Sequence, residues 1–340
     1  MTHPACGPDM VKTFHTYTTA TKESLKKPGK WTVPPPLALC LLLLISGCSI
    51  LTKSQLDSIK VYAVATQEYA QYPGQLIKDY VEVQNSIFLL TSPLVANPEL
   101  AAERILSHHK SKTAVLEEAE RFDLSFDILK EYAKSLEILS TPDYFEKTYT
   151  NIENTGTHLD LLIENYNSKF DKAIPGGLGS LVYQSMVMVG KRYLDHKRGD
   201  ILKEYIAKGE PVIKEISEIS KRFLEEKVAE EWVQDIDQEL KSAHSAVRRQ
   251  ILVDTLNYSN NTLPIIQLDT QVAKLYDDLR QLRKLNQSLV TSIDELYLAH
   301  HSIHLQVQQK KKLTSILNEV TLFVSEVYEI RKLNKALSQE

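Results

Sequence analysis

Three histidines near the end of the chain, His300, His301 and His304, form its densest histidine cluster. Residues four apart on a helix share a face, so the ring nitrogens of His300 and His304 are placed as in helical metal sites. Neighbouring positions such as Leu296 and Gln308 supply no carboxylate, and a third ligand would have to come from another helix. The pattern therefore predicts histidines in a helix contact or at the surface and no bound cofactor. A metal-binding or enzymatic site at His300 and His304 is the alternative.

A second candidate for chemistry is Cys48, because its thiol follows a short apolar segment. Basic residues in the range 22–30 precede nine apolar residues, 37–45, and the small residues Ser46 and Gly47 stand directly before the cysteine. Nine residues are too few to cross about 30 Å of hydrocarbon, which takes about 20 helical residues. This order of positive, apolar and small residues is typical of a cleaved signal peptide.

The run LISGC at residues 44–48 resembles the lipobox of bacterial lipoproteins. The resemblance implies diacylation of the Cys48 thiol, cleavage after Gly47 and acylation of the new α-amine. Two or three acyl chains make a stable membrane anchor, whereas one chain holds a protein only marginally. Ser49 rather than Asp after the cysteine favours the outer membrane, by analogy with enterobacterial sorting. The alternatives are an ordinary secretory signal peptide and a short buried helix.

The predicted domains follow from this cleavage. Residues 1–47 form the signal peptide, whose length suggests a true start further downstream. Residues 48–52 form the lipidated N-terminus with a short tether, and residues 53–340 form the folded domain. Cys6 and Cys40 leave with the signal, so the mature chain has no pair of thiols for an internal disulfide.

Charge excludes some partners. The chain has 40 basic and 44 acidic residues, and removing residues 1–47, with five lysines and two acids, leaves a net charge of about −7. This balance argues against nucleic acid as a partner and against a polybasic membrane patch. The expected partners are the membrane, through the lipid, and another protein of the cell envelope.

Beyond Cys48 the pattern is helical, because glycine and proline are sparse and strand-like alternation is nearly absent. Asn97-Pro98 and Thr141-Pro142 have the residues of a helix cap followed by proline in the first turn. The sequence predicts an all-α protein with helices over about 53–71, 75–90, 98–108, 112–139, 143–170, 178–208 and 211–258, and a last helix that starts near Pro264.

The last helix has the clearest periodicity. Ten of twelve positions that step by four and three residues are apolar, which defines a heptad seam whose polar members are Asn286 and His300. Asn286 is interpreted as a register-setting residue. The seam comprises Leu268, Val272, Leu275, Leu279, Leu282, Asn286, Leu289, Ile293, Leu296, His300, Ile303 and Val307.

The phase of this seam shifts at residues 310–312, which indicates a change of supercoil or a short loop before a second apolar series from Leu313 to Ile330. A similar apolar series in the range 213–240 predicts antiparallel packing across a turn near Asn260. The expected architecture is an elongated helical bundle with long antiparallel hairpins.

Residues 173–190 form an uncharged stretch of 18 residues between two lysines. Helical pore-forming toxins of the haemolysin E type pair long helices with such an apolar tongue, and the expected architecture is loosely similar. Under that alternative Val187 and Val189 would touch a membrane. The favoured interpretation is a buried helix entered through a glycine-rich loop. The run GGLGS at residues 176–180 does not form a P-loop, because it lacks the P-loop lysine.

Acidic residues such as Glu225, Glu226, Glu230 and Glu231 are interpreted as charges on solvated helix faces. Since no catalytic constellation is readable, the sequence favours a lipid-anchored envelope protein that acts as a non-catalytic scaffold or partner-binding module. A membrane-active helical protein and a metal-dependent enzyme remain the alternatives.

Overall fold

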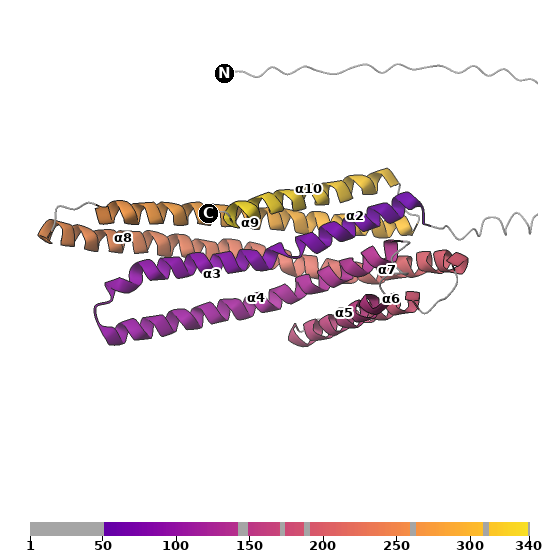
Figure 1. Ribbon diagram of the computed structural model, residues 1–340, viewed down its shortest axis with the longest axis horizontal. Helices are drawn as coiled ribbons and strands as arrows, with labels where there is room; N and C mark the ends of the chain where they lie inside the picture. The colour runs from indigo at the N-terminus through magenta and orange to yellow at the C-terminus, as the bar shows by residue number, and fades with distance from the viewer. Residues whose placement is uncertain are drawn as a thin grey trace, which may run out of the picture. The chain divides into compact units, whose positions relative to one another are not determined.

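The computed structural model describes residues 51–141, 149–170, 174–186, 191–258, 263–308 and 313–338. They belong to the compact unit Ser49–Glu340. All regular structure in these ranges is helical, which confirms the predicted all-α bundle (Figure 1). The elements in chain order are α2 (Lys53–Tyr69), α3 (Tyr72–Thr91), the short 3-10 helix η1 (Ser92–Leu94), α4 (Pro98–Ser140), α5 (Tyr149–Lys169), α6 (Leu178–Met186), α7 (Lys191–Arg222), the π-helical segment η3 (Phe223–Trp232), α8 (Val233–Tyr258), α9 (Leu263–Val307) and α10 (Leu313–Ser338).

Local capping sets the starts of two helices. The Asn97 side chain accepts hydrogen bonds from the backbone N–H groups of Glu99 and Leu100, at 2.8 and 3.2 Å, and Pro98 occupies the first position of α4. Thr52 caps α2 in the same way, with its side chain accepting from the Gln55 N–H. The predicted cap at Asn97 is thus confirmed, whereas the region after Thr141 lies outside the described residues.

Two predicted helix boundaries are wrong. The helices expected over 98–108 and 112–139 are one helix, α4, of 43 residues. The break expected at Pro211 is also absent, because Pro211 lies inside α7. Proline removes one backbone hydrogen bond from a helix, but the next two residues, Val212 and Ile213, are fully buried, and this packing keeps the backbone helical.

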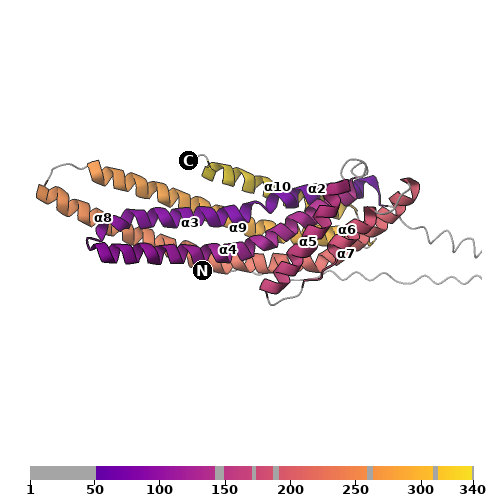
Figure 2. The same ribbon diagram turned by 60° about the horizontal axis from the view of Figure 1, so that its bottom comes forward.

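The antiparallel packing expected across residue 260 is confirmed by contacts whose residue numbers run in opposite directions. Glu210 contacts His300, Lys221 contacts Asp294 and Arg248 contacts Asp269. The segments α7, η3 and α8 therefore run antiparallel to α9 along most of its 45 residues, a length of about 68 Å (Figure 2).

All twelve seam positions of α9 are buried, so the heptad pattern identified the core face of this helix correctly. The later apolar series is buried where it is described, at Val320, Phe323, Val327 and Ile330. It belongs to α10, which follows the end of α9 at Val307 and packs back on α9 and α2. The phase shift near residue 310 therefore coincides with the change from α9 to α10.

Candidate functional site

Gly47 and Cys48, the predicted cleavage and lipidation site, lie outside the described residues. The first residue that the structure describes is Leu51, which is 7% exposed and packs in the core. Thr52 and Gln55 then form a reciprocal capping box, with the Thr52 N–H donating to Gln55 Oε1 at 2.7 Å. The described helical bundle thus starts within a few residues of the predicted anchor in the sequence.

The histidine cluster lies near the C-terminal end of α9, opposite α7. His300 is completely buried, and its two ring nitrogens make two hydrogen bonds of 2.7 Å. Nδ1 meets Glu210 Oε2 and Nε2 meets the hydroxyl of Tyr132. Because a carboxylate only accepts, Nδ1–H donates to Glu210, and in the neutral ring Nε2 accepts from Tyr132.

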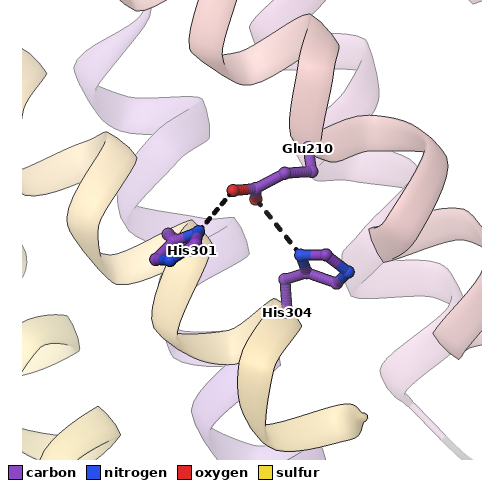
Figure 3. A group of neighbouring side chains, drawn as sticks. All are labelled: Glu210, His301 and His304. Atoms are coloured by element: carbon purple, nitrogen blue, oxygen red, sulfur yellow. Dashed lines mark hydrogen bonds and ion pairs between the residues drawn. The ribbon is translucent and has the colours of Figure 1, made fainter.

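Glu210 of α7 joins the histidines into one cluster (Figure 3). Its Oε1 lies 2.6 Å from His301 Nδ1, and its Oε2 lies 3.8 Å from His304 Nδ1. Burial by itself would raise the pKa of Glu210, but hydrogen bonds and charge from His300 and His301 outweigh it and lower the pKa to about 2. The carboxylate is therefore ionised at neutral pH.

Aromatic packing fixes the buried side of the cluster. Tyr132 stacks on Tyr205 with ring centroids 4.9 Å apart, and Tyr62 of α2 lies 5.8 Å from His300. Burial raises the pKa of Tyr132 well above its usual value, so its hydroxyl stays protonated and able to donate. Gly209 permits this arrangement, since a Cβ there would lie 2.3 Å from the Tyr132 hydroxyl oxygen.

The structure alters which histidines can serve as metal ligands. His300 has both nitrogens engaged, whereas His301, His304 and Glu210 offer ligand atoms that all lie within 4.8 Å of one another. The carboxylate comes from another helix, as the sequence required, but nothing in the sequence identified Glu210. Glu210 could not be predicted because it is 90 residues from His300 in the sequence. Helical periodicity relates residues within one helix and does not pair residues on different helices.

Asn286, the other polar seam residue, donates a hydrogen bond of 3.1 Å to the backbone carbonyl of Leu224 in η3. That carbonyl belongs to the π-helical segment, where the regular backbone pattern changes. The bond ties α9 to one position along η3, which agrees with a register-setting role. The four acidic residues at 225, 226, 230 and 231 are exposed, in agreement with a solvated face.

The uncharged segment 173–190 is described at residues 174–186. Leu178, Leu181 and Val182 are buried, and α6 packs against α5 and α7. Gly156 and Gly179 approach so closely that a Cβ on Gly179 would lie 1.8 Å from the Gly156 carbonyl oxygen. This packing favours the buried-helix interpretation, while Val187 and Val189 lie outside the described residues. Within the described ranges, no helix combines the length and apolar character needed to cross a membrane.

An apolar groove of about 360 Å³ lies between α2 and α10. Val61 and Val64 of α2 and Tyr328 of α10 are each about half exposed in it. Glu68 and Arg331 form an ion pair across the same helix pair. The groove thus combines accessible apolar side chains with a charged boundary, a combination suited to binding another protein.

Comparison of the chain with protein-family models, with curated proteins and with solved structures finds no match.

Proposed function

We propose that this protein is a bacterial envelope lipoprotein, anchored by lipid on Cys48, whose helical bundle acts by binding another envelope protein rather than by catalysis. One observation carries the proposal: the compact unit Ser49–Glu340 starts directly after the lipobox-like run at residues 44–48. The favoured location is the outer membrane, facing the periplasm or the cell surface.

The short tether has a physical consequence. Four residues separate Cys48 from the first residue of α2. Even fully extended, this length of chain would hold the start of α2 within roughly 17 Å of the lipidated residue. The bundle would therefore be held close to the membrane by α2, the helix that also forms one wall of the apolar groove.

We propose an amphipathic helix of a different envelope protein as the occupant of this groove. Two neighbouring helices form its walls, and the wall residues recur at helical spacing, as Val61 and Val64 do on α2 and Val324 and Val327 do on α10. A third helix can lay its apolar face between two such ridges.

The anchor is tested by feeding a labelled palmitate analogue to bacteria that express the full chain. The wild-type protein should incorporate label, and Cys48→Ala should not. Cys40→Ala is the matched control, because Cys40 lies in the apolar part of the signal and leaves with it. Label retained by Cys48→Ala, or absent from the wild type, contradicts the proposal.

A further inference from the structure

We propose that Glu210, His301 and His304 bind one divalent transition-metal ion of the zinc class, bridging α7 and α9. Two imidazole nitrogens and one carboxylate oxygen make up a donor set that zinc accepts in proteins. The proposal is independent of the lipid anchor, because all three residues belong to the helical bundle.

The distances fit this assignment. An ion about 2.1 Å from each donor atom would place the donors roughly 3.4 Å apart in tetrahedral geometry. The three candidate ligand atoms already lie within 4.8 Å of one another, so small side-chain rotations suffice. Three protein ligands would leave a fourth position for water.

The hydrogen bond between His301 and Glu210 also fits a metal site. His301 Nδ1 lies 2.6 Å from Glu210 Oε1, so the two candidate ligand atoms already face each other. In the tautomer that carries its proton on Nε2, the Nδ1 lone pair of His301 is available to an ion at this place.

His300 acts as a positioning residue for the carboxylate. Its hydrogen bond to Glu210 Oε2, backed by the Tyr132 hydroxyl, holds the carboxylate toward His301 and His304. Hydrogen bonds of this kind orient metal ligands and contribute to affinity. The buried side of the cluster is therefore fixed before any ion arrives.

The other side of the cluster is partly exposed. The side chains of His301 and His304 are 40% and 24% exposed, and that of Glu210 is 15% exposed. His304 Nδ1 itself is buried, so an ion that enters beside His301 would reach it after the imidazole rings rotate. Once bound, it would link two helices whose contacting residues are about 90 positions apart, and it would stabilise the folded state by mass action.

The test uses the full chain, purified without a histidine tag from the cell fraction that contains it and stripped with a chelator. Zinc is titrated against a chromophoric competitor, and the melting temperature is recorded with and without zinc. The wild type should bind one zinc ion per chain at low micromolar or lower concentration and melt at a higher temperature with zinc.

His301→Gln, His304→Gln and Glu210→Gln should each weaken zinc binding at least tenfold and abolish the zinc-dependent rise in melting temperature. His109→Gln, at an exposed position of α4, is the matched control and should bind as the wild type does. Far-UV circular dichroism verifies that each variant is folded, and two folded ligand variants suffice. Absence of saturable binding to the wild type, or equal binding by wild type and ligand variants, overturns the proposal.

Discussion

At the level of single residues, His300 links α9 to both α7 and α4. This side chain is completely buried and satisfies two partners at once, the Glu210 carboxylate and the Tyr132 hydroxyl. Buried polar groups lower stability when their partners are removed, because they have already lost their water. Replacing this one residue therefore removes one hydrogen bond from the Glu210 carboxylate and one from the Tyr132 hydroxyl.

We expect His300→Ala to lower the free energy of unfolding by about 3 kcal/mol, the sum of a small cavity and two lost hydrogen bonds. Urea unfolding in the presence of a chelator measures this difference. The control is His109→Ala on the exposed face of α4, which should change stability by less than about 0.5 kcal/mol. Equal effects of the two substitutions would contradict the hydrogen-bond arrangement around His300.

The sequence predicted part of this site. The stepping of apolar residues in α9 placed His300 and Asn286 on the buried seam, because periodicity within one helix is a local property. The partner carboxylate was not predictable. Glu210 lies beside Pro211, where the sequence indicated a helix end, and its approach to α9 depends on tertiary packing.

At the level of elements, α7 contains two glycines and a proline, residue types that weaken helices. Gly209 is required by its neighbour, because any Cβ there meets the ring of Tyr132. Gly199, in the same helix, has no such contact, since nothing lies within 4 Å of the position of its Cβ. Glycine thus serves close packing at one position and has no evident structural role at the other.

Substitution of the two glycines should therefore have opposite effects. Gly209→Ala forces Tyr132 to move and should lower the free energy of unfolding by about 1–3 kcal/mol. Gly199→Ala should raise it by about 0.5–1 kcal/mol, because alanine restricts the unfolded chain and favours the helix. Chemical denaturation of both variants beside the wild type measures these shifts, and destabilisation by both would contradict the packing described at Gly209.

A helix boundary could be predicted from the sequence where the sequence contains the residues of a helix cap. Asn97 and Pro98 define the start of α4 through their own backbone geometry and hydrogen bonds. The boundary expected near residue 110 was wrong because no glycine or proline interrupts the polar residues there, and the helix continues. The boundary at Pro211 was wrong because burial of the residues that follow outweighs one lost hydrogen bond.

At the scale of the whole molecule, α2 follows the proposed anchor at Cys48 and also lines the apolar groove with α10. A charge placed in the groove should disrupt binding of a partner helix, because burial of an unpaired carboxylate is unfavourable. Val64 is 46% exposed there, and Val253 of α8, outside the groove, is 48% exposed. The two valines are therefore matched in type and exposure.

We expect the wild-type protein, extracted in mild detergent, to migrate in an assembly larger than one mature chain with its detergent. Val64→Glu should migrate as a single chain, and Val253→Glu should behave as the wild type does. Native mass analysis distinguishes these cases. Three results would contradict the proposal that a different envelope protein occupies the groove. The wild type could migrate as a single chain, or the assembly could be unchanged in Val64→Glu. The assembly could also consist only of copies of this chain, which co-purification of differently tagged copies would reveal.

The proposed anchor requires Cys48 to be the first residue of the mature protein and to carry the lipid. The decisive measurement is the intact mass of the membrane-extracted wild-type chain, compared with that of Cys48→Ala and Cys40→Ala. We expect a mature chain that begins at Cys48 with the added mass of acyl groups in the wild type and in Cys40→Ala, and no acyl mass in Cys48→Ala. A wild-type chain that begins elsewhere, or that carries no acyl groups, would contradict the claim.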